Sequence, residues 1–162
     1  MELNQDFLGK LFEQAKACPS LCQDYELRTS PADPNQRVLK ALLPGTVVPI
    51  HRHPNSTEDV LLLRGKLVVI IYEEVNPFLS FSGKRNAAVF EKGMDAQNVT
   101  TGKRLREVKR IHLDPKVGNY GCVVAQGVWH TVEALIPSVI YVAKDGREGE
   151  DGTENLNLED TL

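Results

Sequence analysis

The chain has 162 residues, a formal net charge of −3 and a hydrophobic fraction of 41%, which suit one globular domain. With no basic surplus and no apolar stretch long enough for a bilayer, neither a nucleic-acid nor a membrane partner is expected. A secretory signal pattern is lacking, and the three cysteines have no framework spacing, so we expect a cytoplasmic protein with reduced thiols.

The first predicted element is an amphipathic helix over residues 3–17. Its apolar residues recur at three- and four-residue spacing, and Pro19 ends the run. The apolar positions are Leu3, Phe7, Leu8, Leu11, Phe12 and Ala15. Residues 19–35 contain several prolines and serines, which indicates an irregular connector or a short extended arm. Residues 1–35 are therefore predicted to form an N-terminal helix and a connecting arm.

From residue 36 onward, short apolar runs alternate with turn residues such as Pro44-Gly45 and Arg64-Gly65. Many short strands at regular spacing are typical of an all-β sandwich or barrel. The predicted strands cover residues 37–43, 46–51, 58–63, 66–73, 87–91, 108–113, 120–124, 130–135 and 139–143. We therefore expect an all-β domain over residues 36–145.

The run from Leu67 to Ile71 is apolar at every position, whereas a strand with one wet face would alternate. We expect the interior of a barrel to cover one face of this strand. The N-terminal helix or a second subunit would cover the other face, and the second case implies a homodimer.

Two further segments are polar. Residues 93–107 are predicted to form a long loop, and residues 146–162 an acidic, flexible tail. A basic cluster overlaps the loop and is interpreted as a solvated surface. It consists of Lys103, Arg104, Arg106, Lys109 and Arg110.

Three of the four histidines and one glutamate form the pattern most informative about function. His51 and His53 lie two residues apart on a predicted strand, so they share a face while Arg52 points away. Pro54 turns the chain, and Glu58 begins the next strand. We expect this strand to run back alongside the first as a hairpin, which brings the carboxylate to the two imidazoles.

The fourth group is His130, on a distant predicted strand. It follows Gly127, whose conformational freedom permits a tight turn. Neutral imidazoles and one carboxylate suit a divalent transition metal, such as iron, manganese, nickel, zinc, cobalt or copper. Such a ligand set leaves positions for water or a substrate oxygen, as catalytic sites do.

These residues resemble the sequence motifs of the cupins. The first cupin motif, G-x5-H-x-H-x3-4-E-x6-G, is present at every defining position, namely Gly45, His51, His53, Glu58 and Gly65. The second motif, G-x5-P-x-G-x2-H-x3-N, is kept at Gly127 and His130. Ala125 stands in place of its proline and Ala134 in place of its asparagine.

Within the cupins, the chain is similar to the WbuC family of cupin-fold metalloproteins. The resembling segments are residues 36–46, 51–54, 127–132 and 142–146. The resemblance implies a cupin-type jelly-roll β-barrel, often dimeric, with the metal inside. It also implies a link to bacterial O-antigen polysaccharide biosynthesis, but no particular reaction.

Other residues are assigned by their strand parity. Ile111 and Leu113 mark a buried face, so His112 is predicted to face solvent. Trp129 is expected to pack on the face opposite His130. Cys122 is interpreted as an inert, buried thiol. Cys18 and Cys22 are not interpreted as a metal site, because no further Cys or His lies nearby to complete it.

The residues that line the cavity are not determined by parity alone. The candidates are Arg37, Tyr72, Tyr120 and Gln126.

Three functions fit these observations to different degrees. The first is a metal-dependent enzyme that acts on a small, oxygen-rich, saccharide-like substrate, with Glu58 as a ligand and no general base identified. The second is a non-catalytic metal- and ligand-binding or sensory module. The third, a structural barrel without metal, is the one that the ligand spacing favours least. A small molecule is the expected partner in the first two.

Overall fold

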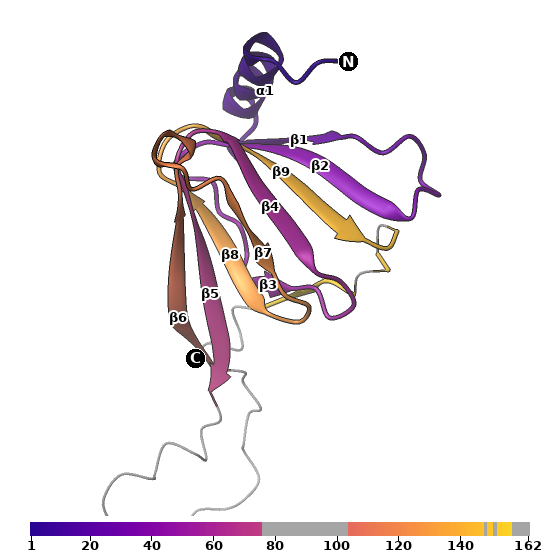
Figure 1. Cartoon of the computed structure of the whole chain (residues 1–162), viewed down its shortest axis with the longest axis vertical. Coiled ribbons are helices and arrows are strands. Elements are labelled where there is room, and N and C mark those ends of the chain that lie inside the picture. The colour runs from indigo at the N-terminus through magenta and orange to yellow at the C-terminus, as the bar shows by residue number, and fades with distance from the viewer. Residues whose placement is uncertain (76–103, 148, 151, 157–162) are drawn as a thin grey trace, which may run out of the picture.

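The computed structural model describes residues 1–75, 104–147, 149, 150 and 152–156, whose strands form two antiparallel sheets (Figure 1). The first sheet has the order β1 (Cys22–Glu26), β2 (Asn35–Leu42), β9 (Ser138–Asp145), β4 (Glu58–Arg64), β7 (Gly121–Val124). The second has the order β10 (Glu154–Asn155), β3 (His51–Arg52), β8 (Trp129–Ala134), β5 (Leu67–Val75), β6 (Arg104–Leu113). The predicted all-β architecture with an N-terminal helix is confirmed.

The main core lies between the two sheets and follows from strand alternation. Along β4, Val60 and Leu62 are buried, whereas Asp59 and Leu61 are exposed. The buried members of this core are Leu42, Val60, Leu62, Leu67, Val69, Leu113, Val124, Val132, Ile140 and Val142. The alternation therefore decides which side chains of each strand can reach a site inside the barrel.

The helix α1 (Gln5–Ala17) covers the outer face of the first sheet. Asn4 caps it, because the Asn4 side-chain oxygen accepts a hydrogen bond from the Phe7 N–H at 3.0 Å. Its apolar stripe packs on β2, β9 and the residue after β2, in a cluster formed by Leu8, Leu11, Phe12, Ala15, Leu39, Ala41, Leu43 and Val139. Leu3, predicted to join this stripe, is 46% exposed because it precedes the helix.

The apolar run on β5 is buried on both faces, as predicted, although α1 lies against the other sheet. Val68 and Ile70, which alternate with the core residues of β5, are only 1% and 5% exposed. Arg110 of β6 and Glu133 of β8 flank β5, and their side chains approach to 3.5 Å across it. The burial of both faces thus arises within one chain and does not require a second subunit.

Several predicted elements differ from the structure. The connecting arm forms β1, which pairs with β2, so the extended-arm alternative is correct. Residues 46–50 are not a strand, because Pro49 lacks an N–H for pairing, and β3 begins only at His51. Residues 104–107, predicted as loop, belong to β6 because they pair with β5. The strand predicted at 87–91 and loop residues 93–103 lie outside the described residues.

The predicted acidic tail includes a strand. Glu154 and Asn155 form β10, which pairs with Arg52 and His51 of β3. This part of residues 146–162 is therefore an edge strand of the second sheet.

Within the described residues, no helix has the length and apolar character that crossing a membrane requires.

Candidate metal centre

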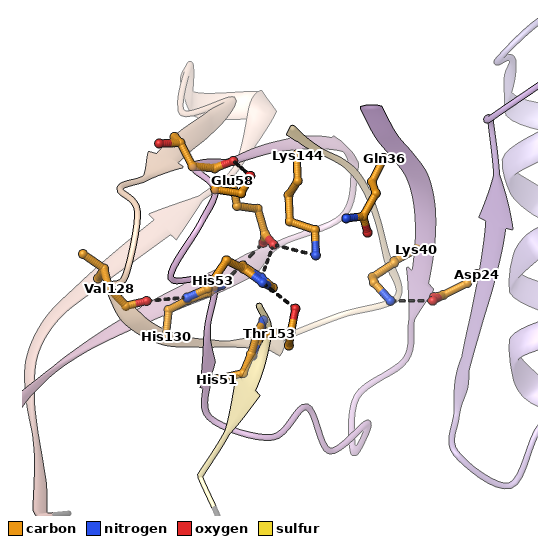
Figure 2. Close-up of polar contacts among 12 residues, drawn as sticks. Asp24, Gln36, Lys40, His51, His53, Glu58, Val128, His130, Lys144 and Thr153 are labelled. Carbon is orange, nitrogen blue, oxygen red and sulfur yellow. Dashed lines mark hydrogen bonds and ion pairs between the residues drawn. The ribbon is translucent and has the colours of Figure 1, made fainter. Parts of the chain in front are cut away.

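The structure brings together the four residues singled out in the sequence (Figure 2). One nitrogen or oxygen atom from each of His51, His53, Glu58 and His130 lies within 4.8 Å of the others. The ring centroids of His51 and His130 are 4.2 Å apart, because β3 and β8 pair directly at these two residues. His51 and His53 share a face, as predicted, with their ring centroids 5.0 Å apart.

The hairpin predicted between His53 and Glu58 is wrong. The strand β4 that begins at Glu58 belongs to the first sheet, whereas β3 belongs to the second. A turn after His53, closed by a 3.3 Å bond from the Ser56 N–H to the His53 carbonyl, carries the chain across. Glu58 therefore reaches the histidines from the facing sheet, and the cluster exists only when both sheets are packed together.

The glutamate carboxylate lies between two of the imidazoles. Its Oε2 atom is 2.8 Å from Nε2 of His53, and its Oε1 atom is 3.5 Å from Nε2 of His130. The segment just before β8 is joined to His53, because the Gly127 N–H donates to the His53 carbonyl at 3.0 Å. The positive φ of 76° at Gly127 supports the predicted turn before His130.

The opposite nitrogen of each imidazole contacts an oxygen. Nδ1 of His51 lies 2.9 Å from the Pro49 carbonyl, and Nδ1 of His130 lies 2.9 Å from the Val128 carbonyl. A carbonyl oxygen only accepts hydrogen bonds, so Nδ1 of both residues is placed to donate, and Nε2 is the nitrogen that can bind a metal. Metal-binding histidines are oriented in this way by acceptors outside the ligand set.

Burial and mutual contacts set the charges of the cluster. Burial raises the pKa of Glu58, but the interactions with His130 and His53 outweigh it and hold the pKa well below its usual range. Burial, followed by the proximity of His130, lowers the pKa of His51 to about 4. At neutral pH the cluster thus presents a carboxylate and a neutral imidazole, the forms that bind divalent metals.

A cavity of about 410 Å³ adjoins the cluster between the two sheets. Its apolar wall includes Ile140 and Val142 of β9, and its polar wall includes Gln36, Lys40 and Lys144. The Nζ atom of Lys144 lies 3.9 Å from Oε2 of Glu58, and Lys40 pairs with Asp24 (Figure 2). Along β9, the inward-facing positions thus change from the apolar Ile140 and Val142 to Lys144 beside Glu58.

The four residues proposed from the sequence to line the cavity do not line it. Arg37 pairs with Asp33 at 2.8 Å, and its neighbour Gln36 faces the cavity instead. Tyr72 lies beside Trp129, Tyr120 is 63% exposed, and Gln126 donates to the Pro54 carbonyl. For these four residues, no neighbouring position of known burial fixed which face of the strand points inward. An error of one residue moves a side chain to the other face.

The parity assignments around the site are confirmed. His112 is exposed. Trp129 is 4% exposed, with the Arg52 guanidinium 4.7 Å from its ring centroid and its Nε1 donating to Glu74 at 2.9 Å. Arg52 therefore points away from the cluster, as expected. Cys122, expected to be buried, is only half-buried; burial, followed by the charge of Glu58, raises the pKa of its thiol, which favours the protonated form.

Lys144 and Thr153 are contact residues of the cluster that were missed in the sequence. Thr153 Oγ1 lies 2.8 Å from Nδ1 of His53, and the residue follows Gly152 within the predicted tail. The only local signal is a threonine and a glycine among acidic residues, which does not identify a strand beside a metal site.

Comparisons with known proteins place the fold. A family model described as a domain of unknown function (DUF6016) matches residues 3–79. No curated protein matches the chain in sequence. Among solved structures, an oxalate oxidase in complex with the substrate analogue glycolate is similar with a TM-score of 0.50 and 14% identity, over 90% of this chain and 63% of that chain.

A second oxalate oxidase structure matches with a TM-score of 0.50 and 16% identity, over 86% of this chain and 57% of that chain. L-ribose isomerase from Cellulomonas parahominis with L-psicose matches with a TM-score of 0.49 and 16% identity, over 77% of this chain and 61% of that chain. This chain thus matches less than two thirds of the length of each of these proteins. The oxalate oxidase likenesses concern the fold alone, and the chain has the cupin jelly-roll fold.

Proposed function

We propose that this protein is a metal-dependent cupin in which His51, His53, Glu58 and His130 hold a divalent transition metal. The observation that carries the proposal is the shared orientation of the imidazoles, whose Nδ1 atoms contact oxygens outside the cluster. Nε2 of His53 and of His130 faces the carboxylate. Iron, manganese, nickel, zinc, cobalt and copper all accept this donor set.

The donor atoms fit a cation. Nε2 of His130 is buried and has no hydrogen-bond partner in the described part of the chain, although Glu58 is nearby. A buried polar atom without a partner is destabilising, and a metal ion would satisfy this nitrogen and the carboxylate together. When bound, the metal would supply Lewis-acid stabilisation of negative charge on a substrate oxygen.

The cavity walls support a small, oxygen-rich, saccharide-like substrate. The ammonium groups of Lys40 and Lys144 and the amide of Gln36 donate hydrogen bonds, which suits hydroxyl, carboxylate or phosphate oxygens. Ile140 and Val142 form an apolar surface that excludes water from one side of such a molecule. The WbuC-like segments agree with a role in polysaccharide biosynthesis.

A non-catalytic binding or sensory module is the second candidate. Two lysines of the cavity wall are held in ion pairs, Lys40 with Asp24 and Lys144 with Glu58. Such pairs orient a ligand without providing a general base. This arrangement fits reversible binding of the same small molecule.

The deciding experiment measures metal first and turnover second. Elemental analysis of the purified and reconstituted protein should find one transition metal ion per chain in the wild type and none in His53→Ala. Turnover of a nucleotide sugar, lost in a folded His53→Ala variant, would favour the enzyme. Tight binding of the sugar without product would favour the module. Failure to take up any transition metal on reconstitution would contradict both.

A cytoplasmic location and a homodimer belong to the same proposal. The three cysteines form no disulfide, which is compatible with a reducing compartment. Light scattering of the purified protein would measure the oligomeric state directly.

A further inference from the structure

Residues 152–156 lie directly against the metal centre. In β10, Glu154 pairs with Arg52, and Asn155 pairs with His51. The Leu156 N–H also donates to the Ile50 carbonyl at 2.8 Å. This segment therefore covers the outer edge of β3. The proposed metal ligand His51 lies on β3, and His53 lies directly after it.

Within this segment, Thr153 makes the contact with the cluster. Its hydroxyl oxygen is 2.8 Å from Nδ1 of His53, a residue that is only 3% exposed, whereas Thr153 itself is exposed (Figure 2). A histidine that binds a metal through Nε2 carries its proton on Nδ1. The Thr153 hydroxyl is placed to accept that proton in a hydrogen bond.

Contacts on both sides hold Thr153 in place. On one side, Glu154 forms an ion pair with Arg52 at 2.7 Å. On the other, the Asn55 side chain donates to the Glu150 carbonyl at 3.1 Å, and Gly152 lies against Asn55 with a φ of 67°. An added Cβ at Gly152 would lie 2.9 Å from the Asn55 amide nitrogen, so the backbone approaches closely here.

We propose that Thr153 is a positioning residue of the metal site, and that docking of β10 on β3 is coupled to metal binding. This inference rests on the proposed metal centre. The Thr153 hydroxyl holds the His53 ring with Nε2 toward Glu58. By linkage, the metal stabilises the docked strand by the same factor by which the docked strand raises metal affinity.

The test is a Co²⁺ titration of the full-length, metal-free protein followed by visible absorption. Thr153→Val keeps the shape of the side chain but removes the acceptor, and it should weaken Co²⁺ binding about 10- to 100-fold. Its absorption spectrum at saturation should also differ, because the His53 ring is less constrained. Thr153→Ser keeps the hydroxyl and should restore both the affinity and the spectrum.

Hydrogen exchange measures the coupling between metal binding and the docking of β10 on β3. Hydrogen exchange of the Leu156 amide should slow when Co²⁺ binds the wild type, and slow less in Thr153→Val. Glu154→Ala removes the ion pair to Arg52 but keeps the hydroxyl. It should weaken Co²⁺ binding and leave the saturated spectrum like that of the wild type.

The outcomes separate this inference from the proposed function. If the wild type takes up no Co²⁺, the metal centre is wrong and the role of Thr153 falls with it. If the wild type binds but Thr153→Val binds equally well with the same spectrum, the positioning role is overturned and the metal centre stands. Equal losses in Thr153→Val and Thr153→Ser also overturn it, because the hydroxyl would then be irrelevant. Unchanged binding in Glu154→Ala, or unchanged Leu156 exchange, overturns the coupling.

Thr153→Val leaves Nδ1 of the buried His53 without this acceptor, so the metal-free variant should unfold at a somewhat lower temperature than the wild type. A cooperative thermal transition of the metal-free variant serves as the folding control.

Discussion

The hydroxyl of Thr153 meets the imidazole of His53 at 2.8 Å, although the two residues are 100 positions apart in the chain. The contact forms because β10 returns to pair with β3 after the chain has completed the barrel. The cluster therefore combines groups from β3, β4 and β8 with a contact from the C-terminal segment. Its geometry depends on the packing of both sheets and the docking of that segment.

His130→Ala should abolish stoichiometric metal binding, with an affinity loss beyond the roughly 100-fold upper range for residues that only support a ligand. His130 is 1% exposed and supplies Nε2 to the cluster. The matched control is His112→Ala, because His112 is exposed on the outside of β6. Calorimetric titration with Zn²⁺ measures both variants. Equal binding by His130→Ala and His112→Ala would exclude His130 as a ligand.

The metal-free protein should lose stability as the pH falls from about 6.5 to 4. His51 has its pKa lowered from 6.5 to about 4 in the folded state. The unfolded chain therefore binds a proton in this window that the folded chain does not, at up to about 1.4 kcal/mol per pH unit. Urea unfolding at several pH values measures the slope.

Protonation of Glu58 also lowers the stability of the folded protein, at a lower pH than His51 does. The pKa of Glu58 is lowered from 4.5, so its stabilising contribution is present above that value and is lost as the pH falls further. The control for the upper window is His51→Gln, which should flatten the stability profile between pH 4 and 6.5. An unchanged slope in that variant would assign the pH dependence to other groups.

Gly65→Ala should destabilise the protein by about 3–5 kcal/mol, combining backbone strain with a steric clash. Gly65 has a φ of 110°, and an added Cβ would clash with Ser138 and lie 2.6 Å from the Pro137 carbonyl. Gly118→Ala is the matched control, since Gly118 has a φ of 86° but no described atom within 4 Å of an added Cβ.

The control variant should lose only about 1–2 kcal/mol, from strain alone. Thermal and urea unfolding compare the two. Equal losses would mean that the turn after β4 relaxes to admit a methyl group.

Leu11→Ala should destabilise the protein by about 2–5 kcal/mol, because it leaves a cavity under α1. Leu11 is 2% exposed and packs against β2 and β9, the strands that carry the polar wall of the cavity. Leu3→Ala, at a position 46% exposed, should change the unfolding free energy by less than about 0.5 kcal/mol. A small effect of Leu11→Ala would show that α1 contributes little to the fold.

Local patterns in the sequence account for much of this protein. Two-residue periodicity identifies most strands and places His51 and His53 on one face with Arg52 on the other. The same reasoning places His112 outside, because its neighbours Ile111 and Leu113 are apolar. Gly65 marks a turn after β4, where its positive φ and close neighbours favour glycine. Each of these inferences concerns residues close together in the chain.

Tertiary structure decided the rest, since the relevant contacts join strands distant in sequence. Glu58 follows His53 closely but lies in the opposite sheet, because the intervening turn crosses the barrel instead of closing a hairpin. Gln36 rather than Arg37 faces the cavity, because pairing with β9 sets the register of β2. Thr153 reaches His53 through β10, which becomes a strand only when β3 offers a free edge. Sequence periodicity determined the faces of the strands, whereas pairing between distant strands determined which faces meet.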